Sequence, residues 1–359
     1  MIPDVIVAVN VGSSSIKFSI FAAQKNLKLL ESGSVSVREG IPEFSLDGKK
    51  AKVIKGDGLK YIAKWLQSNE HLWNVVCIGH RVVHGGSFAK PVLVTSKVIK
   101  ALQRLIPLAP LHQPYNIEAI EILGQEFPRA KQIACFDTAF HTTIAPLVQS
   151  YALPKKYRAA GVRRYGFHGL SYNWIARLLK VRFKPLYNAK VVAAHLGNGS
   201  SLCAMQKGKS YDTTMGMTAL DGLPMGTRSG TIDTGALIYM LRNFGLALDQ
   251  FEHMLEFDSG LKGLSGVSND LRTLLKDNSP DCQFALDYYA FKVAQGIAQM
   301  AVSLGGIDAV VFTGGIAEHN LWLTKKILKQ LKFLGKLKVL TIKCNEEKMI
   351  AMECLALRK

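Results

Sequence analysis

The hydrophobic and polar positions of this chain form two hairpins of the same design. Residues 5–20 contain the apolar runs VIVAVN and IKFSIF, separated by Val-Gly-Ser-Ser-Ser. Residues 190–205, KVVAAHLGNGSSLCAM, repeat the order of apolar strand, glycine and serine turn, and second strand. Apolar runs joined by small turn residues are typical of β-hairpins. The repeat predicts a duplicated chain with two related lobes.

The turns of these hairpins are candidate anion sites. Glycine lets a ligand approach the backbone, and exposed turn N–H groups can surround an anion. One such turn more often only closes a hairpin, but the duplication favours two turns that hold one polyphosphate. A third glycine element, TGGIAE at residues 313–318, follows an apolar strand at residues 308–312 and opens a helix. Its first N–H groups would face a bound anion or nucleotide.

Helical periodicity is the second feature of the pattern. It predicts helices at residues 58–68, 114–127, 234–243, 282–304 and 321–334. Strands that alternate with helices indicate an α/β protein. In the last of these helices the lysines lie apart from the apolar stripe, which favours a solvated lysine face.

Length and composition then limit the class of protein. The chain has 359 residues, more than one hydrophobic core usually supports, so we expect two domains. A hydrophobic fraction of 48% excludes a disordered chain. The longest apolar stretch, residues 297–317, contains Gln299, Asp308 and several glycines, and the N-terminus has no basic segment before an apolar one. We therefore expect neither a membrane span nor a signal peptide, and a cytoplasmic location.

Charge and cysteine content restrict the class of protein less than length and composition do. The six cysteines are far apart and form no Cys-x-x-Cys pair, so we interpret them as reduced core residues. The net charge of +18 is compatible with nucleic acid, an anionic surface or small acidic substrates. We attribute it to a lysine-rich surface and expect no nucleic-acid and no membrane partner.

Several familiar motifs are incomplete. KGKS at residues 207–210 lacks the first glycine of a phosphate-binding P-loop, because Cys203 stands at that position. His80 and His84 have the i, i+4 spacing of a zinc site, but VCIGHRVVHGG is strand-like and no Glu follows His80. By contrast, His80-Arg81, residues 165–169 and residues 225–230 each place a cationic or donor side chain near glycines, as anion sites do.

A set of ordered motifs resembles one family across essentially the whole chain. The runs are NVGSSSIK, HRVVHGG, LAPLHQPYN, FDTAFH, RRYGFHGLS, AHLGNGSS, MGTRSG, GVSNDLR, FTGGIAEHN and CNEEKMIA. They resemble the acetokinase family, in the superfamily of acetate and sugar kinases, Hsp70 and actin. The resemblance implies an α/β fold of two duplicated actin-like (ribonuclease H-like) lobes with the active site in the cleft between them. Residues 1–145 with 344–359 would form the acyl and magnesium side, and residues 146–343 the nucleotide side.

The resemblance also implies roles for individual residues. Asn10 and Glu346 would hold Mg²⁺, with Mn²⁺ as an alternative ion. Arg81 would bind the substrate carboxylate, while Asp137, His168 and Arg228 would be catalytic. The acyl group would lie in an apolar pocket lined by Val83, Leu111, Phe167 and Ala219. The implied ATP and ADP contacts are Lys17, His195, Leu196, Gly197, Asn198, Gly199, Asp270, Leu271, Arg272, Gly314, Gly315, Ile316, Ala317 and Glu318.

The implied activity is reversible, direct in-line phosphoryl transfer from ATP to acetate with Mg²⁺, by a homodimer. Simple chemistry agrees, because acetate is an anion at neutral pH and needs no base. The obstacle is the repulsion between the anions acetate and ATP. Two unit charges ~4 Å apart repel by ~4 kcal/mol at an effective dielectric constant of ~20, and arginines and a metal ion reduce this repulsion.

Departures from the family pattern bear on its finer features. Gln113, Leu170, Tyr172, Ala317, His319 and Ala219 stand where other residues are usual, and Ala219 replaces a frequent proline. They affect the adenosine contacts and the acyl preference. A short-chain acyl kinase preferring propionate or butyrate, and a nucleotide-binding protein without catalysis, remain the alternatives.

Overall fold

The computed structural model describes residues 2–12, 15–38 and 40–358. Contacts divide the chain into two compact units. The first comprises Met1–Thr142, Gly169–Ser171 and Asn345–Lys359. The second comprises Thr143–His168 and Tyr172–Cys344. The C-terminal segment therefore packs with the N-terminal part of the chain.

The first unit is built on an eight-stranded mixed sheet with the order β5-β4-β3-β2-β1-β6-β8-β7. Its strands are β1 (Asp4–Val11), β2 (Ser15–Ala22), β3 (Leu29–Arg38), β4 (Ile41–Leu46), β5 (Lys52–Val53), β6 (Asn74–Val82), β7 (Val92–Leu93) and β8 (Lys131–Phe136). Its helices are α1 (Gly58–Ser68), α2 (Ser96–Gln103), α3 (Gln113–Glu126) and α15 (Glu346–Arg358), with the 3-10 turn η1 (Ile106–Leu108). A second turn, η2 (Ala139–Thr143), ends at the boundary of the unit.

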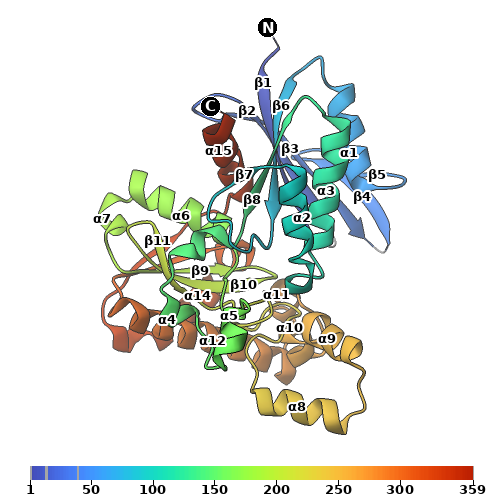
Figure 1. Ribbon diagram of the computed structural model, residues 1–359. Helices are drawn as coiled ribbons and strands as arrows, with labels where there is room; N and C mark the ends of the chain where they lie inside the picture. Colours follow the sequence, from blue (N-terminus) through green and yellow to red (C-terminus); the bar gives the residue numbers. More distant parts are fainter. Residues whose placement is uncertain (1, 13–14, 39, 359) are drawn as a thin grey trace. The chain divides into compact units, whose positions relative to one another are not determined.

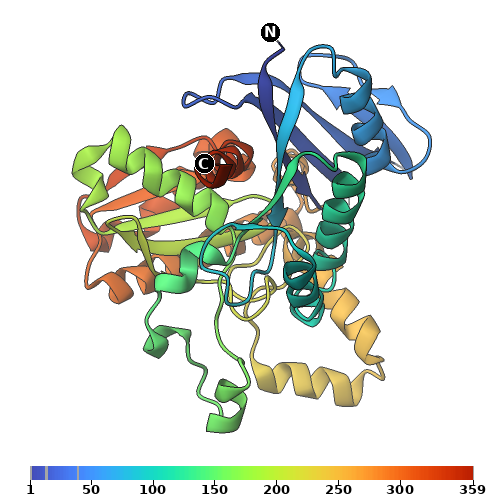
Figure 2. The same ribbon diagram turned by 45° about the horizontal axis from the view of Figure 1, so that its top comes forward.

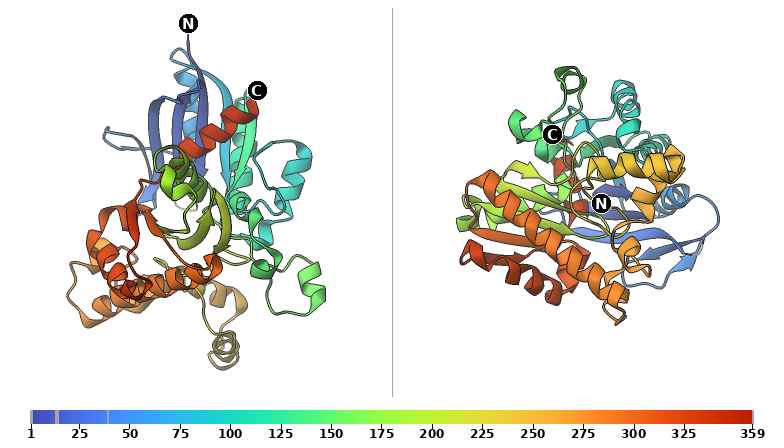
Figure 3. Two further views of the ribbon diagram at one scale, coloured as in Figure 1. Left: turned by 90° about the vertical axis from the view of Figure 1, so that its left-hand side faces the viewer. Right: turned by 90° about the horizontal axis from the view of Figure 1, so that it is seen from below.

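Helices cover both faces of this sheet. Helices α1 and α3 lie against one face, as Figure 1 shows, and their apolar residues pack with Val5, Val7 and Val9 of β1. The other face is covered by α15, which runs across the sheet in the left view of Figure 3. Helix α1 begins where Asp57 accepts a hydrogen bond from the N–H of Lys60, an N-cap that satisfies an otherwise unpaired donor.

The second unit has a five-stranded sheet with the order β11-β10-β9-β12-β13. Its strands are β9 (Val191–Leu196), β10 (Ser200–Gln206), β11 (Lys209–Thr213), β12 (Ala309–Thr313) and β13 (Lys338–Thr341). Its shorter helices are α4 (Pro146–Gln149), α5 (Lys155–Ala159), α7 (Lys184–Tyr187), α9 (Leu248–Phe257), α10 (Gly260–Ser265), α11 (Leu271–Leu274), α13 (Gly315–His319) and η3 (Lys332–Leu334). The longer ones are α6 (Gly169–Val181), whose first residues belong to the first unit, α8 (Thr234–Asn243), α12 (Pro280–Leu304) and α14 (Leu321–Gln330).

Helix α12 organises the core of the second unit. It begins with Ser279 as N-cap and Pro280 at its first position, and it ends at Gly305, whose φ of 65° is left-handed. Its buried face packs with α14 and with the apolar residues of β9, β10 and β12. Helix α8, yellow in Figure 2, lies apart from these strands and has no buried residue among those described.

The same strand pattern occurs in both units. In the first, β1 pairs antiparallel with β2 and parallel with β6. In the second, β9 pairs antiparallel with β10 and parallel with β12. The central strand of each unit is buried, with Val5 and Val192 both fully covered. The two predicted hairpins are therefore equivalent elements of two lobes.

Two predictions about local structure need correction. The helix predicted at residues 321–334 ends at Gln330, and the 3-10 turn η3 continues the apolar stripe. All six cysteines are free, but Cys344 is only half-buried and is not a core residue. The first predicted glycine and serine turn includes Ser13 and Ser14, which lie outside the described residues. Among the described residues, no helix has the length and apolarity needed to cross a membrane.

Candidate active site

Side chains at the carboxyl ends of neighbouring strands form a charged cluster in the first unit. Asn10 lies near the end of β1, Arg81 near the end of β6 and Asp137 directly after β8. Because β1, β6 and β8 are parallel, these ends meet at one edge of the sheet. Glu346 joins them from the first residue of α15.

Arg81 is the centre of this cluster. Its Nε and Nη2 donate to Asp137 Oδ2 at 3.1 and 2.6 Å. Its Nη1 donates to Asn10 Oδ1 at 3.1 Å and lies 3.4 Å from Glu346 Oε2. Asn10 Nδ2 donates to the same Glu346 oxygen at 3.2 Å. The guanidinium is thus held on three sides by oxygen atoms.

The electrostatics of the first cluster are unbalanced. Burial opposes the charged form of Arg81, but the carboxylates of Asp137 and Glu346 outweigh it and raise its pKa above the usual range. Asp137 is 1% exposed. One guanidinium against two carboxylates leaves a formal charge of about −1 before any ligand binds, a surplus that a cation would neutralise.

Helix α3 fixes the backbone that follows Arg81. Asn116 Oδ1 accepts from the N–H of Val83 at 3.0 Å, and its Nδ2 donates to the carbonyl of Val11 at 3.0 Å. Gln113 Oε1 accepts from the N–H of His84 at 3.1 Å, and its Nε2 donates to the carbonyl of His84 at 2.9 Å. Both amides are buried, so they set the position of Val83 rigidly.

A second cluster, in the second unit, is built around His168. This residue precedes α6 and has a left-handed φ of 57°, which is uncommon for a residue with a side chain. Its Nδ1 lies 2.8 Å from Ser201 Oγ, which in turn lies 2.6 Å from Tyr172 Oη. The ring stacks on His195 with 4.2 Å between ring centroids. All three members of the chain His168, Ser201 and Tyr172 are buried.

Arg228 approaches the same place from the loop before α8. Its Nε donates to Glu256 Oε2 at 2.7 Å. A Cβ atom added to Gly199 would lie 3.2 Å from His168 Nε2 and 3.7 Å from Arg228 Nη1. The two side chains therefore converge on the backbone of the Gly197–Gly199 turn, where the missing Cβ leaves room.

The predicted nucleotide residues of the second unit differ in what they can offer. Leu196, Leu271 and Ala317 are buried in the hydrophobic core, so only their backbone can reach a ligand. Asp270 caps α11 and pairs with Arg272 at 2.7 Å, both on the surface. Gly314 has a φ of 87°, and its N–H donates to Glu318 Oε1 at 2.9 Å. Glu318 also accepts from the N–H of Cys344 at 2.8 Å, so it stabilises the backbone.

The remaining predicted residues are divided between the units. Lys17 lies on β2 of the first unit, directly opposite Asn10 in the strand register, and its side chain is exposed. Of the predicted acyl pocket, Val83 and Leu111 belong to the first unit, and Phe167 and Ala219 to the second. Val83 and Phe167 are buried, whereas Leu111 and Ala219 are half-buried.

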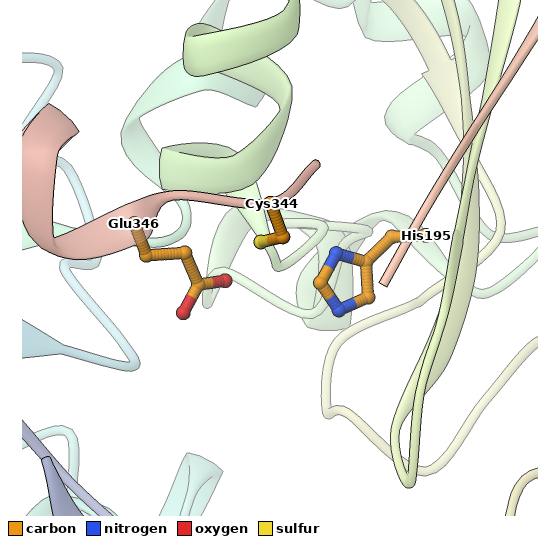
Figure 4. A group of neighbouring side chains, drawn as sticks. All are labelled: His195, Cys344 and Glu346. Carbon is orange, nitrogen blue, oxygen red and sulfur yellow. The ribbon is translucent and has the colours of Figure 1, made fainter. Parts of the chain in front are cut away.

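His195 has a second neighbour that the sequence did not indicate. Figure 4 shows its ring beside Cys344. A ring nitrogen of His195 and Sγ of Cys344 lie within 4.8 Å of each other. Glu346, also drawn, belongs to the first unit. Imidazole and thiol are ligands for softer ions than Mg²⁺, which prefers oxygen atoms. The oxygen atoms of Asn10 and Glu346 match Mg²⁺ better.

Comparison with known proteins identifies the family. The model of the acetokinase family matches residues 5–353. The acetate kinase of Rickettsia felis is 38% identical, over 98% of this chain and 99% of its own length. The chain belongs to the acetokinase family.

Solved acetokinase structures share its fold. A propionate kinase from Francisella tularensis superposes with a TM-score of 0.91 at 34% identity, covering 98% of each chain. An acetate kinase from Porphyromonas gingivalis gives a TM-score of 0.89 at 30% identity, covering 99% of this chain and 100% of that one. The family, the actin-like α/β fold class and the assignment as a kinase are therefore confirmed.

The structure of this acetokinase also contains polar residues that the sequence did not reveal. Glu256, Ser201 and Asn116 each hold a predicted site residue, although none was itself predicted. The signal for two of them was indirect, because Ser201 ends the AHLGNGSS run and Asn116 ends the LAPLHQPYN run. Glu256 and Arg228 are 28 positions apart, and a single ion-pair partner at that separation leaves no local pattern.

Proposed function

We propose that this chain is an acetate kinase that transfers the γ-phosphoryl group of ATP to acetate and releases ADP and acetyl phosphate. The observation that carries the proposal is the first cluster, in which Asn10, Asp137 and Glu346 hold Arg81 and the apolar Val83, two residues further along the chain, is buried. A guanidinium next to an apolar side chain suits a small carboxylate with a methyl group. The family membership supports the same substrate class.

The proposed reaction needs no proton transfer to start. Acetate is ionised at neutral pH, so one of its oxygens attacks the γ-phosphorus directly. The bond from the γ-phosphorus to the bridging oxygen breaks in line, and its electron pair leaves with ADP. We assign Arg81 the role of binding the acetate carboxylate. Asp137 accepts no proton in this scheme and instead orients Arg81.

The first cluster also fits a divalent ion. Asn10 and Glu346 provide hard oxygen atoms, and Mg²⁺ commonly binds one or two carboxylates together with substrate phosphates. The surplus negative charge around Arg81 also favours a bound cation, because without one it would repel acetate and ATP. We propose that Asn10 and Glu346 hold Mg²⁺, or Mn²⁺ in its place. When bound, the ion would neutralise charge on the nucleotide phosphates.

The second unit is assigned to the nucleotide and the transferred group. We propose that His168 and Arg228 stabilise the charge on the phosphoryl oxygens, because both converge on Gly199. The turn at residues 195–199, the segment at 270–272 and the glycines of 314–318 would bind ATP mainly through backbone N–H groups. Lys17, which lies opposite Asn10 on β2, would meet the phosphates from the first unit.

The remaining expectations concern the acyl pocket and the molecule's surroundings. We propose that Val83, Leu111, Phe167 and Ala219 enclose the methyl group of acetate, that the enzyme acts in the cytoplasm and that it is a homodimer. The mass of the purified protein measured by light scattering tests the last point, and a monomer would overturn it.

Preference for propionate is the alternative that a specific observation favours. The matched Francisella tularensis structure is described as a propionate kinase. Ala219 is also smaller than the proline that often stands there in the family. Hydrophobic pockets discriminate one methylene by only ~1 to 3 kcal/mol, so propionate should react as a secondary substrate.

Initial rates with acetate, propionate and butyrate at equal ATP and Mg²⁺ test the proposal. We expect ADP formation with kcat/KM for acetate the highest, and loss of activity in Arg81→Ala. A higher value for propionate would select the alternative. ATP binding by calorimetry without turnover of any of the three acids would indicate a nucleotide-binding protein instead.

A further inference from the structure

Three buried polar side chains of the second unit form a continuous hydrogen-bonded chain that ends on His168. Tyr172 Oη and Ser201 Oγ are 2.6 Å apart, and Ser201 Oγ and His168 Nδ1 are 2.8 Å apart. Tyr172 and Ser201 are 0% exposed, and His168 is 8% exposed. Such a chain, shielded from water, constrains the proton positions of its members.

The chemistry of the two hydroxyls favours one direction for the bonds of this chain. A phenol O–H is a stronger donor than a serine O–H, and the serine oxygen is the better acceptor. Tyr172 therefore favours donating its proton to Ser201 Oγ, 2.6 Å away. Burial raises the pKa of Tyr172 well above 10, so that proton is present at neutral pH. Ser201 then keeps its own proton, and His168 Nδ1 lies 2.8 Å from its Oγ to accept it.

The geometry points to a specific tautomer of His168. We propose that Tyr172 and Ser201 are positioning residues for the neutral imidazole of His168. They hold the tautomer in which Nδ1 is unprotonated and accepts a hydrogen bond from Ser201, and the ring proton is on Nε2. This Nε2 is the ring atom that faces Gly199, where Arg228 Nη1 also points. The opposite tautomer would aim a lone pair at the same place.

The consequence for catalysis rests on the proposed function. If the γ-phosphoryl group lies beside Gly199, an Nε2–H donor stabilises its oxygens, whereas an unprotonated Nε2 would repel them. A donor fixed in advance needs no rearrangement during transfer. The left-handed backbone of His168 fits this role, since strained residues persist where the surroundings hold them in place.

Nitrogen NMR of the full chain with ¹⁵N-labelled histidine tests the proposal directly. The chain has nine histidines, and His168→Gln identifies the signals of His168. At pH 8 we expect wild-type shifts of an Nε2–H tautomer. Removing the hydroxyls by Ser201→Ala or Tyr172→Phe should shift His168 toward a mixture of tautomers. An Nδ1–H tautomer in the wild type, or no change in either variant, would overturn the proposal.

A matched pair of residues provides the control. Tyr289 of α12 is also 0% exposed, and its hydroxyl bonds Ser200 of β10 at 2.8 Å. This second Tyr–Ser pair uses a different serine from the one that lies 2.8 Å from His168. Tyr289→Phe removes an equivalent buried hydroxyl and should leave the His168 signals unchanged. If it altered them as much as Tyr172→Phe does, a general loosening of the core would explain the effect.

Kinetics then connect the tautomer to turnover. We expect Ser201→Ala and Tyr172→Phe to lower kcat about tenfold, with KM for acetate and ATP within about twofold, because ground-state binding does not need the Nε2 proton. Unchanged kcat with an altered tautomer would reject the catalytic role of the chain. The NMR result requires no turnover. A wild-type protein with the predicted tautomer but no acetate phosphorylation would therefore reject only the proposed function.

Discussion

The two clusters hold their arginines by different means. In the first unit, Arg81 contacts Asp137, Glu346 and Asn10, so two carboxylates surround one guanidinium. In the second unit, Arg228 pairs with the single carboxylate of Glu256 through Nε. Exposure does not explain the difference, because the Arg81 and Arg228 side chains are 19% and 17% exposed.

Under the proposed function, this difference gives the chain two ways to bind an anionic substrate. The first cluster is negative by itself, so it would suit acetate only after a bound metal ion had changed its charge. The second cluster is neutral by itself, and its donors are arranged by uncharged hydroxyls and one ion pair. Binding in the first unit should therefore depend strongly on charge, whereas binding in the second should depend on the directions of hydrogen bonds.

The largest effects are expected when each arginine is replaced by lysine. Lysine keeps the charge but cannot reproduce the planar fork that reaches several oxygens at once. We expect kcat/KM to fall about 10³-fold for Arg81→Lys and about 10²-fold for Arg228→Lys. The two variants should differ in which kinetic parameter changes. Arg81→Lys should raise KM for acetate, and Arg228→Lys should mainly lower kcat. If Arg228→Lys kept most of the wild-type kcat, its proposed role would be wrong.

Neutralising the carboxylates that hold the arginines should lower activity less than replacing the arginines does, and by unequal amounts. Asp137→Asn keeps the size of the side chain but removes one of two charges on Arg81, and we expect kcat to fall about 10²-fold with a shifted Mg²⁺ dependence. Glu256→Gln can still accept from Arg228 Nε, so we expect only about a tenfold loss. Kinetics at several Mg²⁺ concentrations measure both.

The pH dependence of Asp137→Asn separates two roles of this carboxylate. An orienting residue predicts a loss that is the same at all pH values, because ionised acetate needs no base. Recovery of wild-type kcat on raising the pH would instead indicate proton transfer and contradict the orienting role. Equal losses in Asp137→Asn and Glu256→Gln would remove the contrast between the two clusters.

Much of the fold could be predicted because it depends on local patterns. The hairpin at residues 190–205 and the helices α1 and α8 follow directly from periodicity, turn residues and N-caps. The helix at residues 321–334 was predicted too long because its apolar stripe continues through a 3-10 turn with similar spacing. Periodicity alone does not separate these two structures.

The partners of the site residues could not be predicted in the same way. Glu256 contacts Arg228, and Ser201 contacts His168 and Tyr172. All of these partners are distant in sequence, and such contacts depend on packing. Resemblance to the family supplied His168 and Arg228, whereas Ser201 and Glu256, which hold them, emerged only from the structure. Cys344 illustrates the converse, because a cysteine interpreted as core is half-buried beside His195.

A further contrast concerns stability, because the first unit contains a buried neutral histidine next to Arg81. Burial lowers the pKa of His80 to about 4 from 6.5, partly opposed by its bond to Gln132. The unfolded chain takes up this proton below pH 6.5, but the folded chain does so only near pH 4. The contribution of His80 to the free energy of unfolding is therefore fully present above pH 6.5. It decreases as the pH falls toward 4, by up to about 3 kcal/mol.

His80→Gln should flatten this dependence. Urea unfolding between pH 7 and 4.5 measures it, in a background of Trp174→Phe and Trp322→Phe so that Trp65 and Trp73 report on the first unit alone. The exposed His71→Gln is the control and should retain the wild-type slope. An unchanged slope in His80→Gln would show that His80 is not the titrating group.

The smallest effect is expected at the predicted acyl pocket, where Ala219 stands in place of a frequent proline. Ala219 is half-buried, and proline would add ring atoms without adding charge. A narrower pocket should reject propionate more strongly than acetate, by about 1 kcal/mol or roughly fivefold in the ratio of kcat/KM values. Side-by-side rates for acetate and propionate with Ala219→Pro measure this ratio, and Ala219→Val separates added volume from the rigid backbone of proline. Because neither change alters the charged groups of either cluster, kcat for acetate should stay within about twofold of wild type. An unchanged ratio in both variants would place Ala219 outside the pocket and leave the selection of the acid to the residues around Val83.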